Sequence, residues 1–184
     1  MSTSVRLCTP ADLNLAARTL TAAFTDYPWT RHVIPDDDYL RRLHALQRLY
    51  LAHALQNGIT AVVDDGSGVI ALLPPGAPDP DHHILEQIMT LHGDRLDRLP
   101  QETSSHGDWT LETLRVHPQA QGRGAGGALL EFGLALAARR GARAIRLETS
   151  SQDNVRLYER HGFQVTGRRD LPDGPSVWTM RAEV

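Results

Sequence analysis

The sequence predicts an α/β fold in which a mixed central sheet of about six or seven strands carries helices on both faces. Three observations lead to this prediction. A chain of 184 residues has the size of one domain. Apolar residues recur with the periods of strands and of helices in alternating segments. In the middle of the chain a strand, a long helix and a second strand follow one another, which predicts a right-handed crossover between two parallel strands.

The composition is that of a globular protein, with 41% hydrophobic and 22% charged residues. No apolar run is long enough to cross a bilayer, and the N-terminal segment lacks the features of a signal peptide. We therefore expect a cytoplasmic protein without membrane contact, formed by one domain over residues 1–184 as a monomer or homodimer. The net charge of −3 gives no basic patch for nucleic acid.

Two residue counts exclude further classes of chemistry. All basic side chains other than histidine are arginines, so a Schiff-base lysine and a P-loop lysine are absent. Cys8 is the single cysteine, and it lies in a short apolar run that predicts a buried strand.

The first half of the chain predicts two helices and three strands. A strand over residues 5–9 is followed by a helix start, with Thr9 as N-cap and Pro10 in the first helical position. Acidic residues 36–38 precede a second helix. The apolar faces of the two helices comprise Leu13, Ala16, Ala17, Leu20 and Phe24, and Leu40, Leu43, Leu46, Leu49 and Leu55. Residues 59–63 and 69–73 flank a turn of Asp and Gly and predict an antiparallel hairpin.

The second half alternates between the two element types. Helices are expected at residues 81–91, 124–140 and 154–161, and strands at residues 109–116, 144–149, 163–167 and 176–183. Gly162 stands where a left-handed residue commonly ends a helix.

A glycine-rich turn joins the strand at residues 109–116 to the long helix. It consists of Gln121, Gly122, Arg123, Gly124, Ala125, Gly126 and Gly127. Glycines allow main-chain N–H groups to approach an anion closely, and a helix N-terminus favours phosphate. The turn lacks the GK[ST] ending of a P-loop and the spacing GxGxxG. By itself it predicts either an anion site or close packing of a helix on a sheet.

With its spacing QxxGxG, this turn resembles the coenzyme-binding turn of the GNAT family of N-acetyltransferases. The later segment LETSSQDNVRLYERHGFQV resembles the next segment of that family, a strand leading to a short helix with Asn154 and Tyr158 on one face. VRLCTPADLNLAARTLTAAFTDYPWTRH and LPDGPSVWTM are similar to segments of the puromycin N-acetyltransferase branch.

The resemblance implies an acetyl-CoA site where two parallel strands splay apart, between the strand that ends at Val116 and the strand that ends at Thr149. The main chain at Leu114, Arg115 and Val116 would hold the pantetheine arm, with the Val116 N–H facing the thioester oxygen. The glycine-rich turn would bind the pyrophosphate, Asn154 would lie beside the arm, and Tyr158 would protonate the departing thiolate.

Glu112 is the first candidate for the base that deprotonates the amine. Strand alternation places it on the same face as Leu114 and Val116. Glu148, on the adjacent strand, is the second candidate. The alternatives are a solvent-facing carboxylate for Glu112 and a structural ion pair for Glu148.

Tyr27 and Trp29 follow the first helix and are expected to bind the acceptor together with Glu112, or else to fill the space between two helices. The histidines, including His82, His83 and His92, lack the spacing of metal ligands, and we expect no metal.

The function predicted from the resemblance is transfer of an acetyl group from acetyl-CoA to the amine of a small molecule, such as an aminonucleoside antibiotic. Two alternatives stay open at this point. One is a module that binds acyl-CoA without catalysis, and the other is an acetyltransferase of proteins or peptides.

Overall fold

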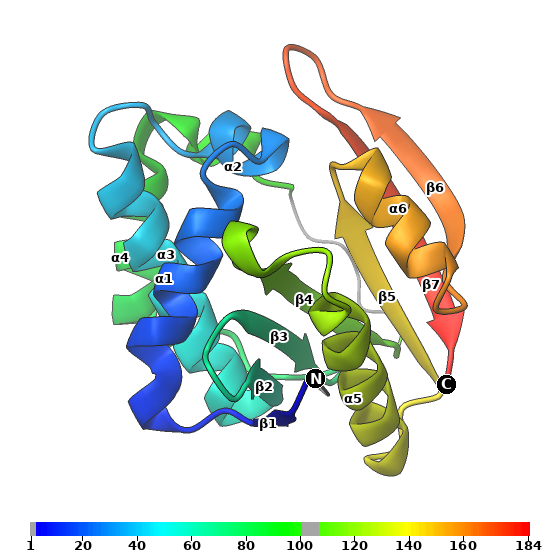
Figure 1. Ribbon diagram of the computed structural model, residues 1–184. Coiled ribbons are helices and arrows are strands. Elements are labelled where there is room, and N and C mark those ends of the chain that lie inside the picture. Colours follow the sequence, from blue (N-terminus) through cyan, green and yellow to red (C-terminus); the bar gives the residue numbers. More distant parts are fainter. Residues whose placement is uncertain (1–2, 101–106) are drawn as a thin grey trace.

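The computed structural model describes residues 3–100 and 107–184, and within them seven strands form one mixed sheet (Figure 1). The strand order is β1-β2-β3-β4-β5-β7-β6. The strands are β1 (Val5–Leu7), β2 (Ile59–Val63), β3 (Gly68–Leu73), β4 (Trp109–Val116), β5 (Ala144–Thr149), β6 (Gln164–Asp170) and β7 (Ser176–Glu183). The pairs are antiparallel except for β4 and β5. The predicted mixed sheet with one parallel pair is confirmed.

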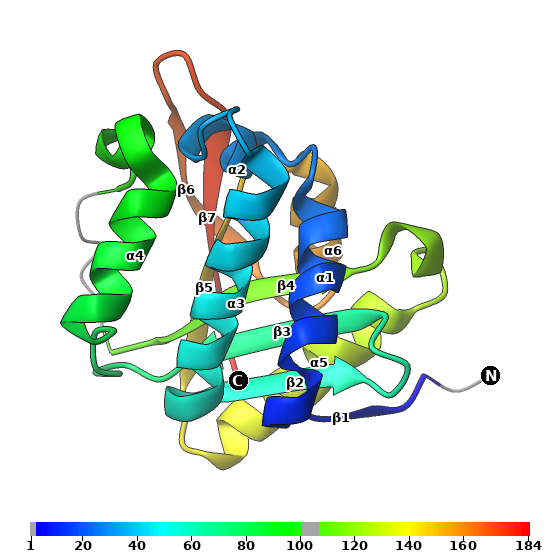
Figure 2. The ribbon, with the colours of Figure 1, turned by 90° about the vertical axis from the view of Figure 1, so that its left-hand side faces the viewer.

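Helices cover both faces of this sheet, as predicted. The helices are α1 (Leu13–Phe24), α2 (Pro28–Val33), α3 (Tyr39–Asn57), α4 (His82–His92), α5 (Ala125–Arg139) and α6 (Gln152–Glu159). Figure 2 shows α1 and α3 side by side across one face of the sheet, with α5 behind it. Two core clusters result, one between the sheet and α5 and one between the sheet and α1 and α3. Among the described residues, none of the helices has the length and apolar character needed to cross a membrane.

Several short elements were not predicted, and two of them lie near the site described below. The helix α2 starts with Pro28 in its first turn and has six residues, and a 3₁₀ helix runs from Gly93 to Arg98. Neither is long enough to show a repeating apolar face. Residues of α2 line this site, as do His92 and Leu99 on either side of the 3₁₀ helix, and Arg95 of the 3₁₀ helix donates to the carbonyl of Arg31 in α2 at 2.7 Å.

The parallel strands β4 and β5 pair at two positions and then separate. Trp109 faces Ile145 and Thr110 faces Arg146, and no pair follows. On its other side β4 stays paired with β3 up to Val116. The predicted splay between β4 and β5 is therefore present, and the gap opens along the C-terminal half of β4.

The register of β3 and β4 shows which main-chain groups face the gap. His117 donates to Ser67 at 2.7 Å, which marks these two residues as a hydrogen-bonded pair. Hydrogen-bonded and non-hydrogen-bonded pairs alternate in an antiparallel ladder. It follows that Arg115 bonds β3, whereas the N–H and C=O groups of Leu114 and Val116 point toward β5.

A β-bulge corrects the predicted orientation of Glu112. The register shifts between Ala71 and Leu72, so that Glu112 is an extra residue in β4. As a result Leu111 and Leu114, three residues apart, lie in the same core cluster. The prediction that Glu112 shares a face with Leu114 and Val116 is wrong, because strict alternation does not hold across a bulge.

Gly58 joins α3 to β2 and is packed so closely that one added methyl group is expected to destabilise the fold. A Cβ atom at Gly58 would lie 2.1 Å from the carbonyl oxygen of Leu72. We expect Gly58→Ala to reduce the free energy of unfolding by about 1–3 kcal/mol, since main chain has to move. Gly167→Ala is the control, because the nearest atoms there are 3.9 Å away. Equal denaturation midpoints for the two variants would contradict this packing.

Candidate active site

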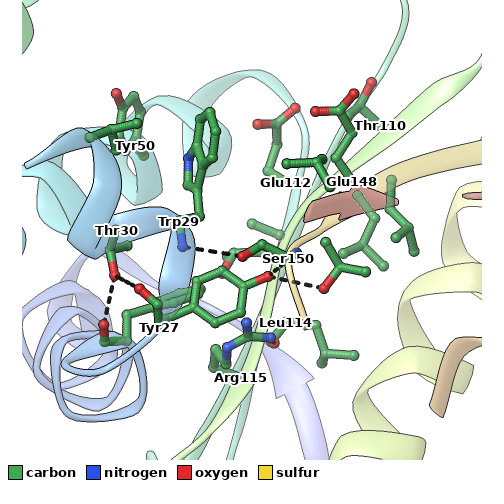
Figure 3. Close-up of a pocket in the computed structure, with 18 of the residues that line it drawn as sticks. Tyr27, Trp29, Thr30, Tyr50, Thr110, Glu112, Leu114, Arg115, Glu148 and Ser150 are labelled. Carbon is green, nitrogen blue, oxygen red and sulfur yellow. Dashed lines mark hydrogen bonds between the residues drawn. The ribbon is translucent and has the colours of Figure 1, made fainter. Parts of the chain in front are cut away.

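A cavity of about 440 Å³ lies between α1, α2 and α3 on one side and β4 and β5 on the other. It extends into the gap between the two strands, because residues on both β4 and β5 line it. Figure 3 shows Tyr27, Trp29 and Tyr50 on the helical side and Glu112, Leu114 and Arg115 on β4. The cavity thus joins Leu114 and Arg115, two of the predicted coenzyme residues, to the predicted acceptor residues, whereas Val116, Asn154 and residues 121–127 do not line it.

The glycine-rich turn has the conformation that requires glycine at two positions. Gly122 and Gly124 have φ angles of 76° and 83°, which L side chains rarely adopt. A Cβ at either position would meet no atom within 4 Å, so their glycine character does not come from packing. The turn leads into α5, whose first main-chain bond joins the Ala128 N–H to the Gly124 carbonyl. The N–H groups of Ala125, Gly126 and Gly127 have no partner within the helix.

Gly126 and Gly127 have a second role. A Cβ at Gly127 would lie 3.3 Å from His161, next to α6, and one at Gly126 would lie 3.9 Å from Leu157 of α6. These glycines bring α5 close to the helix that carries Tyr158. The packing interpretation of the glycine-rich turn therefore applies to Gly126 and Gly127, and the anion site at the turn stays a prediction.

Side chains bond the carbonyls that face the gap. Arg115 donates to the Leu114 carbonyl at 2.9 Å, and Gln121 donates to the Val116 carbonyl at 3.0 Å. The N–H groups of Leu114 and Val116 point the same way as these carbonyls. They are the donors of β4 that a ligand in the gap can use.

Tyr158 reaches the cavity from α6. Its side chain packs on Phe163, with 5.6 Å between ring centroids, and the residue is 3% exposed. Burial raises the pKa of Tyr158 to about 12, and the nearby charge of Arg115 opposes the rise. The hydroxyl is therefore protonated at neutral pH, as a general acid must be.

The side chain of Arg115 is the centre of the site that sequence reasoning missed. Its guanidinium lies 4.3 Å from the ring centroids of both Phe24 and Tyr27. With the Asn154 amide oxygen turned toward it, both terminal nitrogens donate to that oxygen at 3.1 Å. Arg115 thereby connects α1 on one face of the sheet to α6 on the other. Arg115 stands among the alternating residues of a predicted strand, and nothing in the sequence indicates this contact.

Tyr27 and Trp29 line the cavity, and both also hold α2 against the end of β5. The Ser150 N–H donates to the Tyr27 hydroxyl at 2.7 Å, and the Thr149 hydroxyl is 3.0 Å away. The main-chain N–H of Trp29 donates to the Ser150 hydroxyl at 3.2 Å. Although burial acts in the opposite direction, Arg115 and these hydrogen bonds lower the pKa of Tyr27.

The two candidate bases differ in their surroundings. Glu112 is accessible through the cavity that it lines. The surrounding protein nevertheless raises its pKa, and the charge of Arg146 opposes the rise. Glu148 also lines the cavity, but both its oxygens accept from Arg169 at 3.1 Å. This ion pair favours the structural interpretation of Glu148 and leaves Glu112 as the stronger candidate.

The histidines do not assemble a metal site. In residues 3–100 and 107–184 no group of three or more His, Cys, Asp or Glu side chains is arranged to hold a metal ion. His92 is instead buried against α3, and His82 and His83 lie on the exposed start of α4.

Comparison with known proteins identifies the architecture. The family model described as "Acetyltransferase (GNAT) family" matches residues 68–163, which is 96 of the 184 residues. The match covers β3 to the end of α6 and so includes the glycine-rich turn, β4, β5 and Tyr158.

Solved structures extend the likeness over the whole chain. A histone acetyltransferase HPA2 and related acetyltransferase from Corynebacterium glutamicum is 28% identical, with a TM-score of 0.80 over 99% of this chain and 96% of its own. An agmatine N-acetyltransferase is 19% identical, with a TM-score of 0.67 and full coverage of both chains. A GNAT acetyltransferase from Brucella melitensis, solved with acetyl-CoA, is 24% identical, with a TM-score of 0.54 over 95% of this chain and 94% of its own.

The raised pKa of Glu112 predicts a cost in stability. The folded protein binds this proton more tightly than the unfolded chain, so stability falls as the pH rises from the unfolded pKa through the folded pKa. Glu112→Gln removes the cost. We expect its Tm to exceed that of the wild type by about 1–2 °C at pH 8 and to match it near pH 4.

Glu148→Gln is the matched control for this comparison. It removes a carboxylate that is paired with Arg169, and it should not raise the Tm at pH 8. A Glu112→Gln variant that melts below the wild type at pH 8 would contradict the raised pKa of Glu112.

Proposed function

The chain belongs to the GNAT acetyltransferase family, and on that premise we propose that it transfers the acetyl group of acetyl-CoA to the amine of a small molecule. One observation carries the proposal. Leu114 with its unpaired N–H group, the acid Tyr158 and the carboxylate Glu112 line the same cavity, and the N–H of Val116 follows two residues further along the gap. Each matches one requirement of acyl transfer to an amine.

The gap beside β4 fits the thioester arm of acetyl-CoA. An amide-bearing arm can pair with the main chain of Leu114 and Val116 as a further strand would. The Val116 N–H then donates to the thioester oxygen and stabilises the negative charge that grows there during attack. At the same end of β4, the glycine-rich turn and the free amides of α5 supply a site for the pyrophosphate.

Glu112 is the proposed base. A primary amine is protonated at neutral pH and must lose a proton before it attacks. A carboxylate with a raised pKa accepts a proton more readily than an ordinary one, and it attracts the cationic amine into the cavity. Trp29 and Tyr27 supply apolar area for the rest of the acceptor.

Tyr158 is the proposed acid. The nitrogen forms its bond to the carbonyl carbon and releases its surplus proton to water, the carbon–sulfur bond breaks, and the thiolate takes the hydroxyl proton of Tyr158. The Arg115 guanidinium stabilises the phenolate that remains until a proton returns from solvent or from Glu112. Asn154 and the rings of Phe24 and Tyr27 hold this guanidinium in place.

We propose direct transfer within a ternary complex. An acetyl-enzyme would require a nucleophile in the cavity, and the single cysteine does not supply one. Cys8 is buried beside β1, outside the residues that line the cavity, and burial raises the pKa of its thiol to about 11. A thiol with so high a pKa is a poor nucleophile.

The cavity favours a small acceptor over a peptide. Its volume of about 440 Å³ lies in the range of small-molecule sites. The similar agmatine N-acetyltransferase acts on a small amine, as its name states. The proposed acceptors are therefore small amines of the cytoplasm, and antibiotics with a free amine, such as aminonucleosides, belong to this class.

A thiol-release assay tests the proposed function. We expect free CoA to appear when acetyl-CoA is mixed with the protein and a suitable member of a panel of aminonucleosides, aminoglycosides, polyamines and arylalkylamines. A histone-tail peptide serves as the comparison substrate. Release with peptide alone would replace the proposal by protein acetylation. Tight binding of acetyl-CoA without release in any mixture would indicate a non-catalytic module.

Replacement of Tyr158 tests the proposed acid. Tyr158→Phe should lower kcat by about 10²–10⁴ because the thiolate then leaves without a proton. The dissociation constant for CoA, measured by calorimetry, should change little. Tyr39→Phe removes a buried hydroxyl that does not line the cavity and should keep its kcat. Unchanged turnover of Tyr158→Phe at saturating acetyl-CoA would remove Tyr158 from this role.

A further inference from the structure

Tyr50 and His92 form a polar pair on the helical wall of the cavity, outside the residues assigned above. Tyr50 belongs to α3 and His92 ends α4, and both line the cavity. In Figure 3 the Tyr50 side chain stands on α3, on the side opposite β4. His92 is 2% exposed, whereas Tyr50 is 42% exposed. One member of the pair is thus sealed in the core, and the other is accessible.

The hydrogen bonds of His92 determine which of its two ring nitrogens carries the proton. Its Nδ1 atom is 2.7 Å from the carbonyl oxygen of Val33. A carbonyl accepts hydrogen bonds and cannot donate one, so Nδ1 carries the proton. No carboxylate among the described residues forms a salt bridge with His92, and burial lowers its pKa, although the Val33 carbonyl opposes this. The imidazole is therefore neutral, and Nε2 has a free lone pair.

The histidine in turn fixes the proton of Tyr50. The Tyr50 hydroxyl is 3.2 Å from Nε2 of His92. Because Nε2 can only accept, the hydroxyl donates to it, and the proton of Tyr50 is held toward the core. Although part of the Tyr50 ring is accessible, the protein around it raises the pKa of Tyr50 to about 12, with the charge of Glu112 acting in the same direction, so the phenol keeps that proton. The oxygen of Tyr50 then offers the cavity lone pairs and no donor.

We propose that Tyr50, oriented by His92, is a subsite that selects amines bearing a second hydrogen-bond donor, an O–H or N–H group remote from the nitrogen that is acetylated. A hydroxyl of the acceptor can donate to the Tyr50 oxygen. A methyl ether at the same position places two acceptors against each other and loses the bond. The inference rests on the proposed use of this cavity for the acceptor.

Matched amines test the subsite by binding, independently of turnover. The probes are 4-hydroxyphenethylamine against 4-methoxyphenethylamine, and 5-aminopentanol against 5-methoxypentylamine. Their dissociation constants are measured by calorimetry with the protein saturated with CoA, which carries no acetyl group. We expect the hydroxyl member of at least one pair to bind about tenfold more tightly. This factor corresponds to the loss of one hydrogen bond in the analogue, which leaves the Tyr50 oxygen without a partner.

Two variants identify the source of the preference. In Tyr50→Phe the ratio of the two dissociation constants should fall to near one. In His92→Leu the Tyr50 hydroxyl is free to turn its proton toward the cavity, so the methoxy member should gain affinity while Tyr50 is still present. Tyr39→Phe is the control on the same helix, since its hydroxyl bonds Thr30 at 3.1 Å and does not line the cavity. It should keep the wild-type ratio.

The outcomes separate this proposal from the proposed function. A hydroxyl preference without thiol release would support the subsite and overturn the catalytic proposal. Thiol release with an unchanged ratio in Tyr50→Phe would overturn the subsite alone, as would the failure of every hydroxyl-bearing probe to bind. A ¹⁵N NMR spectrum of His92 gives a direct check. A proton on Nε2 in place of Nδ1 at neutral pH would overturn the assignment even if Tyr50→Phe or His92→Leu failed to fold.

Discussion

The site depends on the separation of two parallel strands. A sheet normally pairs the main-chain groups of neighbouring strands, and unpaired groups in the interior of a protein are costly. Here β4 and β5 pair at two positions and then diverge. The consequence is a row of main-chain donors at the edge of a cavity. The sheet supplies them on a rigid element, because β3 continues to hold β4 up to Val116.

The same separation brings together side chains from both faces of the sheet. In a closed sheet, α6 and α1 could not reach one another. Through the gap, the guanidinium of Arg115 contacts the rings of Phe24 and Tyr27 and also reaches Asn154 and Tyr158. The bulge at Glu112 adds a carboxylate on the acceptor side. The acid and the base of the proposed reaction thus come from opposite faces and meet in one cavity.

Much of this architecture could be predicted from the sequence, because it depends on local signals. Thr9 and Pro10 mark a helix start, and the Asp and Gly residues at 64–68 mark a hairpin. The glycine-rich segment marked a tight turn before the long helix, and Gly162 marked the left-handed end of a helix, where its φ is indeed positive. These features depend on neighbours in the chain, which a sequence displays directly.

The parts that escaped prediction depend on contacts between distant segments. The bulge at Glu112 arises from the register between β3 and β4, and alternation gave the wrong face for its side chain. The contacts of Arg115 join residues more than thirty positions apart, as does the pairing of Tyr50 with His92, separated by 42 positions. The ion pair of Glu148 with Arg169 was one of two open alternatives, and it required a partner from another strand.

Amide hydrogen exchange along β4, measured with and without saturating CoA, tests the central claim most directly. The N–H groups of Leu114 and Val116 face the gap, and their exchange should slow strongly when the arm of the coenzyme pairs with them. The N–H groups of Thr113 and Arg115 already bond β3 and should change little. Equal exchange at Leu114 and Val116 in the two states, under conditions where CoA is bound, would contradict the proposed role of the separated strands.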